Sequence, residues 1–322
     1  MDRQRVLRHP QWCANVIHAG GLSAGERVLV LVDEPLVEEG SQLVAAVKDA
    51  GGEPRLELWA GDHPLAAPPS GALRAAEHTD LSLFLSQEPR GDEADARFAL
   101  LQAVTSHGGR QIFLGFVDGE LLRGELSQPA PDLAKPARAL LAALAGADEL
   151  RIRGRAGTDL ILRVTGRPWL TDALPLQAGG IANYPGGEIF VAPHADGADG
   201  VLVADLTVPY TVEGLVDEPV KLRFERGRVV SIEGGAAAAM LRDLVTGAGA
   251  GADVVAELGI GLNPTIAPRG HVMLDEKAAK TAHVAIGRNT GPYGGDNEAS
   301  IHVDCVFSLP QVEADGRPVQ LP

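Results

Sequence analysis

The 322-residue sequence predicts two unlike halves: an α/β first half with a mainly parallel sheet, and a β-rich second half. Apolar runs alternate with helical patterns up to about residue 147. After residue 148, alternating strand patterns separated by Gly, Asn and Pro turns replace them. The chain is long enough for two domains or for one large α/β unit, and with 45% hydrophobic residues it can bury a sizeable core. We therefore expect an α/β domain at 1–147 and a β-rich domain at 148–322.

The first half reads as a succession of buried strands and helices. The run "ERVLVLVD" (26–33) is continuously apolar, as in a strand buried on both faces, and the helical pattern at 40–52 ends in two glycines. The alternation continues with strand-like and helix-like stretches at 54–60, 79–86, 95–109, 110–117 and 133–147. This order favours a parallel, Rossmann-like sheet. No G-x-G-x-x-G lies between a strand and a helix, so we expect no dinucleotide.

The second half reads as mostly antiparallel strands. Residues 148–166 alternate polar and apolar side chains around a Gly-containing turn, which predicts a β-hairpin. One helix-like segment, 236–245, interrupts the strand patterns. The other strand-like stretches lie at 187–193, 200–209 and 220–235.

Composition excludes several classes of function. The chain has 28 Lys and Arg against 43 Asp and Glu, a net charge of −15, which argues against nucleic acid or an anionic membrane as partner. Its two cysteines, Cys13 and Cys305, form no disulfide framework and fit a cytoplasmic protein. No apolar run approaches the roughly 20 residues that span a bilayer, and the N-terminal segment lacks the apolar core of a signal peptide.

The stretch "SIHVDCVF" places His302 and Asp304 two residues apart in an apolar, β-branched setting. In a strand both side chains project from the same face. Together they offer an imidazole nitrogen and a carboxylate oxygen to a divalent cation. An ordinary His–Asp hydrogen bond, or a hairpin that leaves both in water, is the alternative.

Four further donors interrupt apolar segments of the second half: Glu188, Glu257, Glu276 and His283. Burying a carboxylate is costly without a cation or a positive partner. Glu188 and Glu257 are alternatively strand-end or edge residues in water, and His283 alternatively a core histidine. Three Glu, two His and one Asp in one half of the chain nevertheless indicate a metal site.

The segments "PGGEIFVAP", "AELGIGLNP", "LDEKAAKTAHVAIG" and "GGDNEASIHVDCVF" together resemble the aminopeptidase T family of thermophilic-type metallo-aminopeptidases. The resemblance covers about residues 183–318. It implies a homodimer in which a pair of divalent ions activates a water for peptide hydrolysis. Glu257 would be a ligand or the carboxylate that accepts the proton of that water. The ligands would be Glu188, Glu276, His283, His302 and Asp304.

The resemblance also implies a catalytic tyrosine shortly after His283. Thr290 stands near the expected place, and Tyr293 follows slightly later as the candidate. Arg288 and Asn297 are candidates for binding substrate or positioning a ligand, with a turn or capping role as the alternative.

The donor set favours two ions, since five or six ligands, four of them carboxylates, exceed what one ion needs. Two Zn, Co or Mn ions about 3.5–4 Å apart can share a hydroxide and polarise the scissile carbonyl of a small-molecule or short-peptide substrate. The sequence is also similar to the 2,5-dihydroxypyridine 5,6-dioxygenases, whose single Fe(II) opens an aromatic ring. In that subgroup a histidine matches Glu257, and non-ligand residues match Glu188 and His283. A non-catalytic binding protein is the third alternative.

Overall fold

The computed structural model describes residues 9–88, 92–173, 176–309 and 311–322. Residues 1–8, which hold part of the segment expected to lack a signal-peptide core, lie outside the described residues. Contacts between Cα atoms divide the chain into two compact units. Unit 1 comprises Met1–Ala130 and Leu174–Gly186, and unit 2 comprises Pro131–Ala173 and Gly187–Pro322.

Unit 1 contains a five-stranded sheet in the order β2-β1-β3-β4-β8, and every neighbouring pair is parallel. The predicted parallel sheet of the first half is thereby confirmed. Its strands are β1 (Arg27–Asp33), β2 (Glu53–Trp59), β3 (Leu81–Leu85), β4 (Arg110–Leu114) and β8 (Ile181–Asn183).

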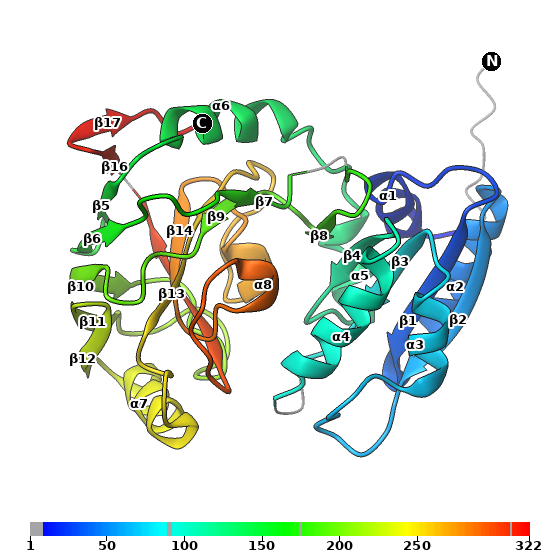
Figure 1. Cartoon of the computed structure of the whole chain (residues 1–322), viewed down its shortest axis with the longest axis horizontal. Coiled ribbons are helices and arrows are strands. Elements are labelled where there is room, and N and C mark those ends of the chain that lie inside the picture. The colour runs from blue at the N-terminus through cyan, green and yellow to red at the C-terminus, as the bar shows by residue number, and fades with distance from the viewer. Residues whose placement is uncertain (1–8, 89–91, 174–175, 310) are drawn as a thin grey trace. The chain divides into compact units, whose positions relative to one another are not determined.

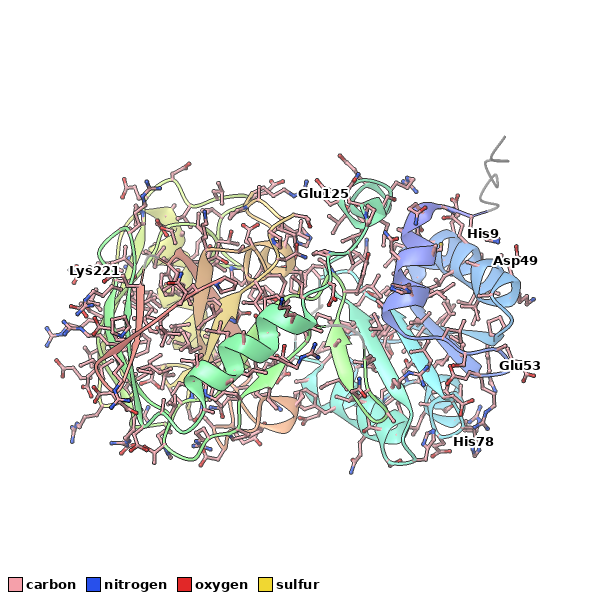
Figure 2. The ribbon with its side chains drawn as sticks, turned by 90° about the horizontal axis from the view of Figure 1, so that it is seen from above. His9, Asp49, Glu53, His78, Glu125 and Lys221 are labelled. Atoms are coloured by element: carbon pink, nitrogen blue, oxygen red, sulfur yellow. The ribbon has the colours of Figure 1, made fainter. Side chains whose placement is uncertain are left out.

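Helices cover both faces of this sheet, because its central strands are apolar on both sides. Leu29 and Leu31 of β1 share a core with residues of α3 and α4, whereas Val32, which points the other way, lies against Gly40 of α2. The helices are α1 (Gln11–Ala19), α2 (Val37–Asp49), α3 (Ser70–Ala76), α4 (Ala94–Thr105) and α5 (Gly119–Arg123), with 3-10 turns η1 (Glu34–Leu36) and η2 (Glu125–Ser127). Ion pairs such as His9–Asp49 lie at the surface (Figure 2).

Unit 2 contains two sheets whose neighbouring strands are all antiparallel, as expected of the second half (Figure 1). Sheet B has seven strands in the order β12-β11-β10-β6-β5-β16-β17, and sheet C has five in the order β15-β14-β13-β9-β7. Sheet B consists of β5 (Glu149–Arg153), β6 (Asp159–Arg163), β10 (Ala198–Ala204), β11 (Val220–Glu225), β12 (Arg228–Glu233), β16 (Gln311–Ala314) and β17 (Arg317–Val319). Sheet C consists of β7 (Leu170–Thr171), β9 (Glu188–Val191), β13 (Val255–Gly261), β14 (Thr281–Gly287) and β15 (His302–Ser308).

The two sheets of unit 2 share one hydrophobic core. Sheet B contributes residues such as Leu162 and Leu222, and sheet C contributes Leu258, Val284 and Cys305. The predicted hairpin at 148–166 is the β5–β6 pair. The helical elements are α6 (Ala134–Leu144), α7 (Ala236–Ala248), α8 (Val272–Asp275) and the 3-10 turn η3 (Gly291–Tyr293).

Two segments near the expected 147/148 boundary are assigned by what they pack against. Helix α6 places Ala137, Leu140 and Leu144 in the core of unit 2. Conversely, residues 181–183 pair in parallel with β4 and complete the sheet of unit 1. Within the described part of the chain, no helix is both long and apolar enough to cross a membrane.

Candidate metal centre

Sheet C gathers five of the six predicted ligands on one of its faces. Across β13 and β14, Gly259 lies opposite His283 and Glu257 opposite Ala285; Ala285 in turn lies opposite Asp304 on β15. On the remaining strands, Gly261 pairs with Glu188 and Gly287 with His302. Since side chains alternate along each strand, all of these residues share a face. The opposite face carries the apolar residues of the core.

Small residues on the same face make room for the donors. A Cβ atom on Gly259 would lie within 3 Å of three ring atoms of His283, so the imidazole rests directly on the glycine. A Cβ on Gly261 would overlap backbone carbonyls of Glu276 and Ala278. The chain after α8 can therefore approach the sheet only because Gly261 lacks a side chain.

Glu276, the sixth predicted ligand, comes from this segment after α8, drawn in orange beside the strands of sheet C in Figure 1. The fully buried Asp275 anchors it, accepting the backbone N–H of Arg269 (2.9 Å) and Gly270 (2.6 Å) and the hydroxyl of Thr207 (2.5 Å). Asp275 faces these loops, which leaves the next residue, Glu276, to face the sheet.

The donors converge around the Nε2 atom of His283. That atom lies 3.3 Å from Glu257 Oε1, 3.6 Å from Asp304 Oδ1 and 3.7 Å from Glu188 Oε2. His283 belongs to two groups of three residues whose ligand atoms all lie within 4.8 Å of one another. One group contains Glu188 and Glu257, and the other contains Glu276 and Asp304. The structure thus brings all six residues together.

His302 is oriented as a metal-binding histidine would be. Its Nδ1 lies 2.7 Å from the carbonyl oxygen of Arg288; a carbonyl only accepts, so Nδ1 carries the proton and donates it. Nε2 then faces Asp304 Oδ1 (3.2 Å) and Glu257 Oε2 (3.7 Å). A backbone carbonyl bound to the outer nitrogen is the usual support of a ligating imidazole.

Tyr293 reaches the site despite its later position in the sequence. Its half-buried ring stacks on that of His302, with centroids 4.5 Å apart and planes at 17°. Burial, reinforced by the charges of Glu257 and Asp304, raises the pKa of Tyr293 well above its usual value. The phenol therefore keeps its proton at neutral pH and can act as a hydrogen-bond donor.

The carboxylates keep both imidazoles protonated in the metal-free protein. Burial alone would lower the pKa of His283, but the hydrogen bond to Glu257 and the charges of Glu188 and Asp304 raise it to about 10. The pKa of His302 rises to about 9, against burial, mainly because of Asp304. Burial also raises the pKa values of Glu188 and Glu276. A divalent cation would displace these protons, since it binds the deprotonated donors.

Several buried donor atoms lack the partners that burial normally demands. Glu188 Oε2, Glu257 Oε2 and His283 Nδ1 find no hydrogen-bond partner among the described residues. Unpartnered carboxylate oxygens facing an imidazole nitrogen are costly as they stand but suitable for a cation. The mixture of carboxylate and imidazole donors suits a divalent metal ion. The residues therefore fit the divalent metal that the sequence predicts.

The two candidates for substrate binding are engaged in loop structure. Asn297 donates its side-chain N–H groups to the carbonyls of Gly251 (2.9 Å) and Gly287 (2.6 Å). Arg288 Nε donates to the carbonyl of Ala299 (2.7 Å). These bonds support the turn between β14 and β15, and substrate contact by either residue stays a prediction.

Sequence reasoning missed Lys277 and Asp172. Lys277 is fully buried beside Glu188 and Glu276, and Asp172 lies 3.3 Å from its ammonium. The position of Lys277 next to Glu276 in "LDEKAAK" was the available signal, but the sequence alone does not show which of Lys277 and Lys280 is buried.

Known structures share this fold across nearly the whole chain. The 2,5-dihydroxypyridine dioxygenase of Pseudomonas putida matches with a TM-score of 0.77 and 21% identity, covering 97% of this chain and 94% of that one. The AmpT structure from Thermus thermophilus matches with a TM-score of 0.68 and 22% identity, covering 97% and 98%. At such identities the likeness is one of fold.

Sequence comparison identifies relatives with higher sequence identity over part of the chain. Aminopeptidase T of Thermus thermophilus is 31% identical over 181 residues, and aminopeptidase AmpS of Bacillus subtilis 28% over 184 residues. Each alignment covers 50% of this chain but only 43% of the relative, so the match spans under half the length of these proteins. The family model described as thermophilic metalloprotease (M29) matches residues 134–319, more than half of the chain. The resemblance found in the sequence is thereby confirmed, and the chain belongs to the thermophilic metalloprotease (M29) family.

Proposed function

We propose that this protein is a metal-dependent hydrolase that cleaves an amide or peptide bond of a small substrate, as an aminopeptidase does. The observation that carries the proposal is the set of buried carboxylates and imidazoles on one face of sheet C, with oxygens that no described residue satisfies. The names of the relatives, aminopeptidase T and AmpS, support a peptidase substrate.

The proposed ligands are Glu188, Glu276, His283, His302 and Asp304, with Glu257 as ligand or proton acceptor. Charge balance supports two ions. Four buried carboxylates, including Asp172, the partly buried carboxylate of Asp304 and the ammonium of Lys277 together carry a net charge of −4 when both imidazoles are neutral. Two divalent cations would neutralise it, whereas one would leave two charges uncompensated in a buried site. Zn, Co and Mn are the candidates.

Divalent ions in this site would act as Lewis acids toward the scissile carbonyl and lower the pKa of water. Glu257 Oε2 has no hydrogen-bond partner among the described residues, which supports a role in accepting a proton and returning it to the leaving amine. Tyr293 keeps its proton at neutral pH and can donate a hydrogen bond to charge that develops on the substrate oxygen.

Two rival functions are distinguished by the donor count. A mononuclear Fe(II) dioxygenase needs two histidines and one carboxylate, and this site offers three further carboxylates beyond that set. A non-catalytic binding protein that holds no metal would have no need for unpartnered ligand atoms in a buried position.

The decisive experiment is anaerobic purification followed by elemental analysis and assays. We expect two divalent ions per chain and hydrolysis of aminoacyl amides or short peptides. Turnover of dihydroxypyridines with uptake of molecular oxygen would refute the hydrolytic proposal. His302→Ala should lose both metal and activity. His194→Ala is the matched control, because His194 belongs to a second H-x-D motif outside the site and its imidazole hydrogen-bonds the Thr165 carbonyl.

The proposal extends to the cellular context of the enzyme. The family resemblance supports a homodimer, and the composition, with two buried free cysteines, supports a cytoplasmic location. Sedimentation equilibrium of the purified chain tests the dimer; a monomer at micromolar concentration would contradict it.

A further inference from the structure

Lys277 is unusual among the lysines of this protein because its side chain is completely buried. Lys221, labelled in Figure 2, extends from β11 with half of its side chain exposed and lies 3.9 Å from Glu233. Lys277 has no exposed surface and lies two residues after the last residue of α8. A buried ammonium requires negative partners, and here they are Glu188, Glu276 at 2.9 Å and Asp172 at 3.3 Å.

The ammonium binds only one side of the proposed ligand Glu188. Lys277 Nζ contacts Oε1, while Oε2 faces His283 at 3.7 Å without a hydrogen bond. Lys277 also contacts Glu276 through Oε1, and Glu276 belongs to the donor set formed with His283 and Asp304. Lys277 thus binds two of the proposed ligand carboxylates, and it binds Glu188 through the oxygen that does not face His283.

Asp172 fixes the same arrangement through the backbone. Its Oδ1 accepts the N–H groups of Gly187 and Glu188, each at 2.8 Å, and its Oδ2 lies toward Lys277. The ion pair of Asp172 and Lys277 therefore fixes both the backbone at the start of β9 and the side chain of Glu188. Among the described residues, Lys277 has no ion pair within 4.0 Å to Glu257 or Asp304, so its direct contacts reach only one part of the donor set.

We propose that Lys277 is a positioning residue of the metal centre: supported by Asp172, it holds one oxygen of Glu188 and of Glu276 so that each carboxylate presents its other oxygen to the cation. This inference rests on the proposed function. It predicts whether removal of Lys277 weakens or strengthens metal binding. A lysine that only repelled cations would weaken metal binding in the wild type, whereas a lysine that orients ligands strengthens it.

Metal affinity of the Lys277→Met protein, measured by competition with a chelator, tests the sign. We expect binding about 10- to 100-fold weaker than in the wild type, the usual loss when a partner of a ligand is removed. Lys280→Met is the matched control, since Lys280 is exposed three residues later, and it should bind like the wild type. Unchanged or tighter binding by Lys277→Met would overturn the proposal.

A double-mutant cycle separates positioning from general damage. If Lys277 acts through Glu276, combining Lys277→Met with Glu276→Gln should lose less affinity than the sum of the two single losses. The combination with Glu257→Gln should be additive, because Lys277 does not contact Glu257. Additive losses in both cycles would overturn the inference.

Asp172→Asn serves as the second variant if Lys277→Met does not fold, and it should also weaken metal binding; affinity equal to the wild type would overturn the inference. Failure of the proposed function is distinguishable. A wild-type chain that binds no divalent ion refutes both, whereas an active wild type with an unaffected Lys277→Met variant refutes only the role of Lys277.

Discussion

Replacing Gly259 by alanine should disable the metal centre through a single methyl group. Gly259 pairs with His283 across β13 and β14, and its backbone φ is not in the left-handed region, so alanine is acceptable to the backbone itself. The new Cβ, however, would lie within 3 Å of three atoms of the imidazole. The ring must recede by more than about 1 Å to reach an ordinary carbon contact distance.

The magnitude follows from that displacement. Overpacking a tight site costs about 1–3 kcal/mol of stability, and misplacing a reacting group by 1 Å can cost about 10²-fold in rate. We expect Gly259→Ala to lose metal affinity and hydrolysis by about that factor. Both are measured well below the unfolding temperature, by chelator competition and by amide hydrolysis.

Gly247→Ala provides the matched control. Gly247 lies in α7, and an added Cβ would meet nothing within 4 Å. Alanine there should leave metal binding unchanged and raise stability by about 0.5–1 kcal/mol, as in other helix interiors. A Gly259→Ala protein that binds metal as tightly as the wild type would show that His283 is not held where the structure has it.

Three other measurements follow from the site. In the metal-free protein the folded pKa values of His283 and His302, about 10 and 9, exceed the reference of 6.5. The stabilisation of the folded state by these two protonated histidines is therefore complete below pH 6.5 and is lost as the pH rises to 10. Each tenfold gain in proton affinity on folding contributes about 1.4 kcal/mol. Urea titrations in the presence of a chelator measure this change, and a free energy of unfolding that stays constant over this range would contradict it. Tyr293→Phe keeps the ring stacked on His302 but removes the phenol hydroxyl, so kcat should fall on the order of 10²-fold while metal affinity stays unchanged. Equal losses of kcat and metal affinity would assign the hydroxyl to metal binding. Asp275→Asn should lower the free energy of unfolding by about 1–3 kcal/mol in urea titrations, because its Nδ2 would face N–H donors; wild-type stability would mean that the loops hold without it.

Strand alternation is a strong constraint, and it allowed the sequence to predict that His302 and Asp304 share one face of a strand. His302 and Asp304 two residues apart, in a run otherwise apolar, had to face away from the core, and they do. The same reasoning applied to "ELGIG" would also have placed Glu257, Gly259 and Gly261 on one face. What it lacked was the register between β13 and β14, which contains an irregularity between Val255 and Glu257.

Features that depend on distant packing were beyond the sequence. Strand β8 has only three residues, too few for a sequence pattern that predicts its pairing with β4, some seventy residues earlier. Helix α6 shows an apolar face, but nothing in its periodicity says which sheet that face covers. Lys277 belongs to the same class, since its burial depends on the position of Glu188, 89 residues away.

Sheet C explains why so many charges can be buried together. One face, with Leu258, Val284 and Cys305, contributes to a continuous apolar core and supplies the folding energy, so the other face is free to be electrostatically unfavourable. Without cations, that face keeps protons on His283 and His302 and leaves carboxylate oxygens unpartnered. Cations that bind the folded site and not the unfolded chain must therefore stabilise the fold as well. A metal ion bound at this site would therefore also be a structural component of unit 2.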